Sequence, residues 1–135
     1  MSIDRFEDLN SWQEARKLVR PVYQLTKNRA FSRDIGLSRQ IQSAAVSSMG
    51  NISEAHGCYT FEDKRRFLDI SLGSSKEVQS HLYVALDQAY VTQQEFDEAY
   101  HQAEVVAQLV TGSLGSLERQ IAVRPSPRSR LRHNA

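Results

Sequence analysis

The sequence contains a single cysteine, Cys58, and three prolines, two of which lie near the C-terminus. A lone cysteine excludes an internal disulfide and agrees with a reducing compartment. No apolar run approaches the length of a membrane span, and no signal-like apolar segment follows Met1. We therefore expect a soluble, cytoplasmic protein. Strand-period alternation of apolar and polar residues is also missing, so the secondary structure is expected to be helical.

The net charge is +1, but the charges are distributed unevenly along the 135 residues. Residues 1–67 carry a net charge of +3, residues 68–121 a net charge of −6, and residues 122–135 four arginines without an acidic residue. Two interpretations stay open. The segments either form faces of opposite sign that dock copies of the chain or steer anionic partners, or they are ordinary solvated helix faces.

Apolar residues recur with helical spacing in four segments. The first is expected to begin at Ser11, which has capping-box spacing to Glu14. Pro21 falls inside this segment, and we expect a kink or a local break there, because proline lacks an amide donor. Residues 28–37 contain Asn, Ser, Asp and Gly and are predicted to form a connector.

The other three segments have recognisable starts. The second helix is predicted over residues 38–55, with the Ser38 hydroxyl as its cap. The third is capped at Thr60 and reaches about Val91. The fourth opens with the capping box of Thr92 and Glu95 and continues to Leu117.

Four helices with short connectors predict an all-α fold, an antiparallel up-down-up-down four-helix bundle over residues 1–121. Residues 122–135 are rich in Arg, Pro and Ser and are expected to form a disordered basic tail, because they cannot bury enough apolar surface. Further apolar residues lie off the main stripes and favour self-association: Tyr59, Phe61, Tyr83, Tyr90, Tyr100, Val105 and Leu109.

The second and third helices carry small residues where Leu or Ile would be expected, so their axes can approach closely. These residues are Ala44, Ala45, Ser47, Ser48, Gly50, Gly73, Ser74 and Ser75. Asn51 and Glu54, like Ser74 and Glu77, are three residues apart on one helical face. A carboxylate in such a contact needs hydrogen bonds, so we predict a buried polar network of Asn51, Glu54, Ser74 and Glu77 across the two helices.

Basic residues offer a candidate nucleic-acid contact, because cations neutralise phosphates without reading sequence. They are Arg39, the run Lys64, Arg65 and Arg66, and the tail arginines Arg124, Arg128, Arg130 and Arg132. The alternative interpretation is a solvated helix start and a soluble tail.

Metal-ligating and nucleophilic residues form no catalytic motif. Glu77 and His81, and likewise His101 and Glu104, can project together from one helix, but a carboxylate-bridged site in a bundle needs Glu-x-x-His from two helices and two further glutamates. Cys58 lies near a histidine in the sequence, although neighbours in sequence rarely share the geometry of a thiolate and its base. We expect no metal, no cofactor and no enzymatic activity.

Several motifs, in order, resemble the bacterial four-helix-bundle family of 23S rRNA intervening-sequence proteins. The resemblance covers about residues 6–117 and is carried by F-E-D-L-x-x-W-Q-E-A at 6–15, V-Y-x-L-T at 22–26, G-L-S-x-Q-I at 36–41, A-A-V-S-S at 44–48, N-I-S-E at 51–54, F-L-x-I-x-L-G-S at 67–74 and K-E-V at 76–78.

The resemblance implies a four-helix bundle that assembles into a ring-shaped homopentamer. The family is named after members encoded in insertions within large-subunit ribosomal RNA genes, and a related accessory protein of diversity-generating retroelements binds nucleic acid and a reverse transcriptase. The family pattern usually has a basic pair after Q-I, where this chain has Gln42 and Ser43, and a glycine after N-I-x-E, where it has Ala55. Any nucleic-acid contact is therefore expected at residues 64–66 and in the tail.

The sequence as a whole predicts a non-enzymatic, homo-oligomeric helical assembly protein, a scaffold or adaptor that presents faces to a protein partner. The alternative is a protein that binds nucleic acid, foremost RNA, through basic surfaces of a ring-shaped oligomer.

Overall fold

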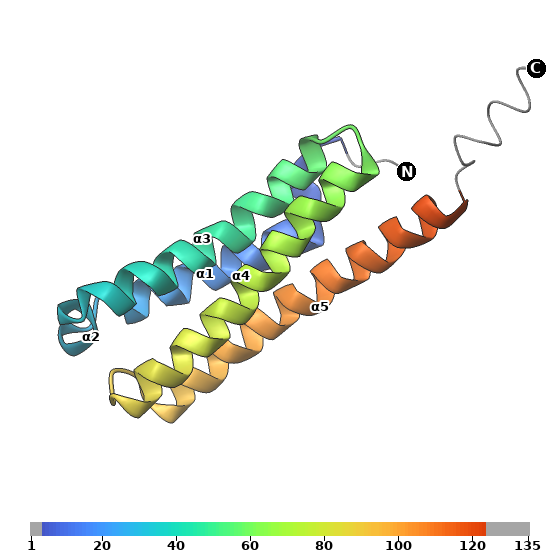
Figure 1. The fold of residues 1–135 in the computed structure, drawn as a ribbon. Coiled ribbons are helices and arrows are strands. Elements are labelled where there is room, and N and C mark those ends of the chain that lie inside the picture. Colours follow the sequence, from blue (N-terminus) through green and yellow to red (C-terminus); the bar gives the residue numbers. More distant parts are fainter. Residues whose placement is uncertain (1–3, 124–135) are drawn as a thin grey trace, which may run out of the picture.

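The computed structural model describes residues 4–123, and each regular element in that range is helical (Figure 1). The predicted all-α class is therefore confirmed. A 3₁₀ turn, η1 (Phe6–Asp8), precedes α1 (Asn10–Leu25), α2 (Arg29–Arg33), α3 (Ile35–Gly57), α4 (Phe61–Asp87) and α5 (Gln93–Val123). The expected disordered tail lies, from residue 124 onward, outside the described residues.

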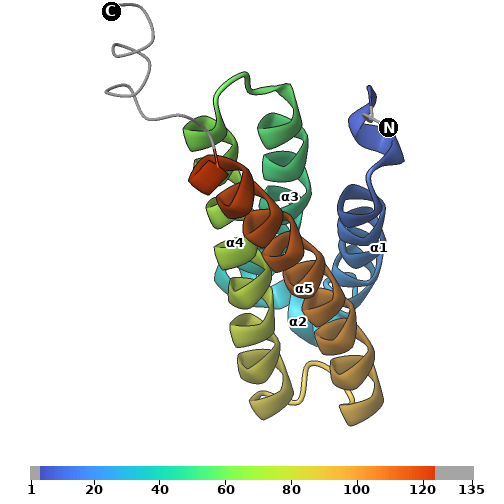
Figure 2. The same ribbon diagram turned by 90° about the vertical axis from the view of Figure 1, so that its right-hand side faces the viewer.

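The four long helices lie side by side, and the chain reverses direction between each of them and the next (Figures 1 and 2). Helix α3 packs against α1 and α4, and α5 packs against α4 and α1. Helices α1 and α4 therefore lie at opposite corners of the bundle. The short α2 lies at the end where α1 finishes and α3 begins, and the last turns of α5 extend past the other helices (Figure 1).

Side-chain caps fix the starts of α4 and α5 as predicted. Thr60 Oγ1 accepts the Asp63 amide at 3.2 Å. Thr92 and Glu95 form a reciprocal capping box, with amide-to-side-chain distances of 3.1 and 2.8 Å. The predicted cap at Ser11 is wrong, because α1 begins at Asn10 and Ser11 is buried in its first turn.

The segment predicted as a connector holds α2 and the start of α3. Asn28 Oδ1 accepts the Ala30 amide at 2.9 Å and caps α2. Asp34 caps α3, so α3 begins before Ser38, whose hydroxyl donates instead to the Phe31 carbonyl at 2.7 Å. The two consecutive caps thus delimit a short helix, α2, in which Phe31 is fully buried in the core.

Two further differences concern helix interiors and ends. Helix α1 continues through Pro21 without the local break that the proline suggested. Lys17 is exposed, so water can satisfy the carbonyl that loses its helical donor. Helix α4 ends at Asp87, earlier than predicted, because Ala89 adopts a left-handed conformation with φ of 58°. The following amide, of Tyr90, donates back to the Ala85 carbonyl at 2.8 Å.

The core lies between the four long helices. Its large, fully buried aliphatic side chains each contribute about 1.5–3 kcal/mol by leaving water: Leu18, Val22, Ile41, Ile52, Val78, Leu82, Val106 and Val110. At the α2 end, Phe31 stacks on Tyr90 with ring centroids 5.3 Å apart, and the Tyr90 hydroxyl donates to Asp34 Oδ2 at 3.1 Å. These contacts tie the α4–α5 connection to the start of α3.

Candidate functional site

A polar seam runs along the contact between α3 and α4. The hydroxyl oxygens of Ser47 and Ser74 lie 2.8 Å apart, and Asn51 Nδ2 donates to the Ser47 carbonyl at 2.8 Å and to its hydroxyl at 3.0 Å. Deeper in the contact, Ser71 Oγ donates to the Ser48 carbonyl at 2.7 Å, and both serines are fully buried. The small side chains thus let a hydroxyl of α4 reach the backbone of α3.

The two carboxylates predicted for this network do not join it. Glu54 is exposed, and the Glu77 carboxylate lies 3.3 Å from Nε2 of His81 on its own helix. The burial predicted for these two residues is therefore wrong in this chain, whereas Asn51 and Ser74 do meet through Ser47. Both glutamates occupy the outer edge of their helices, where a long side chain can turn toward water.

The basic run at the start of α4 is largely engaged within the chain. Lys64 Nζ donates to the carbonyls of Ala55 and His56, at 3.2 and 3.3 Å, and so binds the C-terminal end of α3. Arg65 pairs with Glu118 at 3.4 Å. Arg66 lies 3.9 Å from an Asp63 oxygen and over the ring of the next residue. These contacts leave less free positive charge than the sequence predicts.

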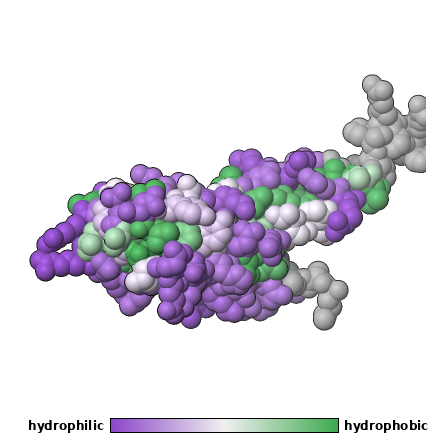
Figure 3. Space-filling model, turned by 90° about the horizontal axis from the view of Figure 1, so that it is seen from below, coloured by the Kyte–Doolittle hydropathy of each residue, from purple (hydrophilic) through white to green (hydrophobic). Residues whose placement is uncertain are grey.

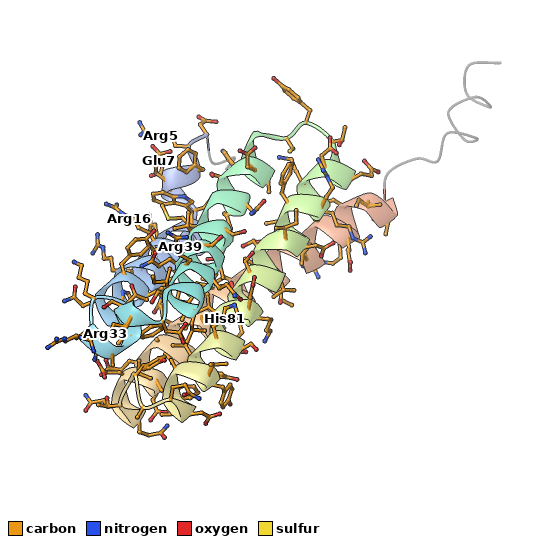
Figure 4. All side chains as sticks on the ribbon, turned by 60° about the vertical axis from the view of Figure 1, so that its left-hand side comes forward. Arg5, Glu7, Arg16, Arg33, Arg39 and His81 are labelled. Atoms are coloured by element: carbon orange, nitrogen blue, oxygen red, sulfur yellow. The ribbon has the colours of Figure 1, made fainter. Side chains whose placement is uncertain are left out.

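A different group of cations is unengaged. Within residues 4–123, seven exposed lysine and arginine side chains form neither a salt bridge nor a hydrogen bond. Arg16 lies over the Trp12 ring and Arg119 is on α5. The other five are Arg20, Lys27, Arg29, Arg33 and Arg39. They come from α1, α2, α3 and the α1–α2 connection, and Figure 4 shows Arg33 and Arg39 on that side of the molecule, together with Arg16. We call these five residues the basic face.

Only Arg39 of the basic face was predicted as a contact. The others are dispersed over residues 20–33 and form no run in the sequence, so the signal that could have found them is the excess of +3 in the N-terminal half. The tail arginines Arg124, Arg128, Arg130 and Arg132 lie outside the described residues.

The outer side of α4 carries exposed apolar residues. Ile70 and Val84 are each 43% exposed, and Tyr83 is 51% exposed. Tyr83 contacts Phe96 and Tyr100 of α5, with ring centroids 4.9 and 5.8 Å apart. The charge and the hydrogen bond of Tyr100, followed by burial, raise the pKa of Tyr83. On the face seen in Figure 3, hydrophobic patches interrupt a largely hydrophilic surface.

Alongside the aromatic cluster, a polar group joins α4 to α5. Glu104 Oε2 accepts from Gln79 Nε2 at 2.9 Å and lies 3.4 Å from Lys76 Nζ. The hydrogen bond from Gln79, followed by that from Lys76, lowers the pKa of the Glu104 carboxyl. This carboxylate therefore bridges two helices, while the nearby His101 is exposed.

A cavity of about 300 Å³ opens at the end of the bundle opposite α2. All four long helices contribute to it, and its walls include Ile52, Leu68, Leu117, His56 and Lys64. Two of its polar lining residues are bound elsewhere: Lys64 to the end of α3, and His56 Nε2 to the Asp4 carbonyl at 3.2 Å.

The two histidine–glutamate pairs weighed as metal ligands, Glu77 with His81 and His101 with Glu104, do not combine into one cluster within the part of the chain that the structure describes. Across residues 4–123, no three histidine, cysteine, aspartate or glutamate side chains are placed to share an ion. Cys58 is half-buried, and its thiol donates to the Glu54 carbonyl at 3.2 Å. In the same range, none of the helices combines the length and the apolar character that crossing a bilayer requires.

Comparison with known proteins supplies a family and a fold. The family model of the 23S rRNA-intervening sequence protein matches residues 7–112. A crystal structure of a protein of unknown function from the S23 ribosomal protein family of Bacteroides thetaiotaomicron is similar, with a TM-score of 0.71 and 18% sequence identity over 77% of this chain and 97% of that chain. At this identity the likeness shows the fold alone. No curated protein matches the sequence.

Proposed function

The chain belongs to the family of 23S rRNA-intervening sequence proteins, and on that premise we propose that it is a non-enzymatic, homo-oligomeric scaffold or adaptor of the cytoplasm. The assembly is a ring, a pentamer, of antiparallel four-helix bundles. The observation that carries this proposal is the exposed apolar side of α4.

Ile70 and Val84 are fourteen positions apart, which is about four helical turns, so they lie on the same side of α4. Tyr83 adjoins Val84 and extends this surface toward the aromatic residues of α5. Covering such residues with a second copy removes apolar area from water, at about 25 cal/mol per Å². The exposed Glu77 lies midway between Ile70 and Val84 on the same side. Gly73, which has no side chain, lets a neighbouring helix approach closely near Ile70.

Multi-angle light scattering after size exclusion measures the mass of the full chain directly. We expect a homo-oligomer, which Ile70→Lys combined with Val84→Lys converts to a monomer of unchanged helicity. Gln24→Lys is the control, since Gln24 is exposed on α1, at the corner of the bundle opposite α4. A concentration-independent monomer of the wild-type chain would contradict the proposed assembly.

The basic face supports a second candidate function, the binding of RNA or DNA. Five exposed cations without partners can displace the counterions of a phosphate backbone. Contacts of this kind are electrostatic and weakly selective for sequence. Affinity should then fall steeply between low and physiological salt, with a slope set by the number of phosphates contacted.

Fluorescence anisotropy with labelled structured RNA, single strands and duplex DNA tests this function. Arg29→Glu, Arg33→Glu and Arg39→Glu together should abolish binding. Replacing Lys64, Arg65 and Arg66 with Ala should have a smaller effect, because these residues are engaged within the chain. Deleting residues 122–135 measures the contribution of the tail. The absence of binding to every probe at low salt would remove this function.

A further inference from the structure

Two hollows flank Trp12 on the surface that α1 shares with η1 and α3. One, of about 210 Å³, lies between the start of α1 and the middle of α3, and the other, of about 330 Å³, lies along the outer side of α1. Trp12 lines both. The first hollow is apolar and the second is cationic, so their juxtaposition suits a ligand that carries an apolar group beside a negative charge.

The apolar hollow has walls of Phe6, Trp12, Val46 and Met49. The Phe6 ring meets Trp12 edge-on at 5.2 Å, and Val46 is 45% exposed. The hollow is also lined by Ser53, whose hydroxyl donates to the Gly50 carbonyl at 2.7 Å and is therefore already engaged. Such a hollow receives an apolar side chain.

Gly50 keeps this hollow open. It lies in the interior of α3, where glycine is about 1 kcal/mol less favourable than alanine. No atom lies within 4 Å of the position that a Cβ would occupy, so packing inside the chain does not require a glycine here. A side chain at this position would instead project into the surface hollow that Gly50 lines.

The cationic hollow is lined by Arg16, Lys17 and Arg20, together with Glu7 and Gln13. Glu7 is neutralised by Arg5, and Lys17 pairs with Glu14 at 3.2 Å. Arg16 lies over the Trp12 ring at 5.9 Å, and within the described chain neither Arg16 nor Arg20 has a carboxylate partner. The hollow therefore offers two guanidinium groups to an anion.

We propose that this site binds an acidic amphipathic segment of a partner protein, with an apolar side chain in the hollow beside Gly50 and carboxylates on Arg16 and Arg20. The recognition is of the helix-in-groove kind. A stacked nucleic-acid base fits less well, because Arg16 already covers the Trp12 ring and the hydroxyl of Ser53 is engaged. The inference deepens the adaptor role and rests on that part of the proposed function.

Trp12 is the only tryptophan of the chain, so its emission reports on the site directly. The probe is a tryptophan-free helical peptide with leucines at i, i+3, i+4 and i+7 and glutamates elsewhere. We expect a saturable shift of Trp12 emission on titration into the full chain. A peptide with serines in place of the leucines, and one with lysines in place of the glutamates, should leave the emission unchanged.

Substitutions in each hollow measure its separate contribution to peptide binding. Gly50→Leu fills the apolar hollow and should weaken binding about tenfold or more, as expected for the loss of an anchor pocket. Gly112→Leu is the matched control, since Gly112 also lies inside a helix with no atom within 4 Å of an added Cβ. Arg16→Glu with Arg20→Glu should abolish binding of the acidic peptide.

The inference is overturned if the acidic peptide produces no shift, if Gly112→Leu weakens binding as much as Gly50→Leu, or if single-stranded RNA shifts Trp12 emission and the peptide does not. Light scattering on the same variants distinguishes a loss of peptide binding from a loss of oligomerisation. Loss of peptide binding by a variant that keeps the wild-type mass supports this site. A wild-type chain that is monomeric but binds the peptide would support the site and contradict the proposed ring.

Discussion

Ser47 on α3 and Ser74 on α4 bring their hydroxyl oxygens within 2.8 Å of each other, twenty-seven residues apart in the sequence. The contact is possible only where two helix axes approach closely, and the buried serine and alanine residues around it make that approach possible. Helix packing and hydrogen bonding therefore depend on the same small side chains, and substitutions there test both.

Ser71→Leu should lower the free energy of unfolding by more than about 2 kcal/mol, because it overpacks a fully buried position and removes the hydrogen bond to the Ser48 carbonyl. Urea denaturation followed by circular dichroism measures the change. Ser80→Leu on the exposed side of the same helix is the control. Equal effects of the two substitutions would show that α3 and α4 are not closely packed at Ser71.

Glu54→Ala and Glu77→Ala should each change the free energy of unfolding by less than about 0.5 kcal/mol, as is usual for exposed positions. Asn51→Ala should cost about 1 kcal/mol, because it removes the side-chain donor to Ser47. Thermal melts of the three variants make the comparison. A large loss on Glu54→Ala would place that carboxylate in a contact between copies of the chain.

Ala89→Gly should stabilise the chain by about 1 kcal/mol, since Ala89 holds a φ of 58°, in the region that glycine adopts without a steric penalty. Ala30→Gly in α2 should instead be destabilising, because Ala30 is also exposed but lies in a right-handed helix. Denaturant midpoints of the two variants should move in opposite directions. Movement in the same direction would contradict the left-handed turn at the end of α4.

The Glu14 carboxyl gives an acid-dependent contribution to stability. Gln102 Nε2 donates to Glu14 Oε2 at 2.8 Å, and this bond, followed by the interaction with Lys17, lowers the pKa of Glu14. A lowered folded-state pKa adds stability that is fully present above the unfolded value of 4.5 and is lost as the pH falls through the folded value.

Gln102→Ala should therefore destabilise the chain at neutral pH, and the difference from wild type should shrink as the pH falls below about 4.5. Urea titrations at a series of pH values measure this difference. Gln120→Ala is the control, since Gln120 is exposed on the same helix and bonds to no carboxylate among the described residues. A difference that does not depend on pH would show that Gln102 contributes packing alone.

Much of the fold follows from local chemistry that the sequence displays. The capping pairs at Thr60 and at Thr92 with Glu95 act within one turn, so spacing alone identifies them. Asn28 and Asp34 are caps of the same kind but stand in a segment too short for helical periodicity to appear. That is why α2 was not predicted.

The polar seam between α3 and α4 was less predictable, because its contacts depend on whether a residue at the border of the helix contact faces the neighbouring helix or the solvent. Asn51 and Ser74 turn into the seam, whereas Glu54 and Glu77 share their spacing and turn outward. Likewise, the reach of Lys64 to the end of α3 depends on the turn that joins the helices. Neither relation can be read from residue spacing along one helix.

The two ends of the bundle differ, and the difference bears on how the chain opens. At one end, the helix connections contact each other through Tyr90, which stacks on Phe31 and donates to Asp34. At the other end, a cavity lies between the four long helices. Local opening requires less energy where fewer buried contacts must break. Amide hydrogens near the cavity should therefore exchange with deuterium well before those around Phe31. We expect local unfolding to begin at the cavity end and to spread along the helix axes toward α2.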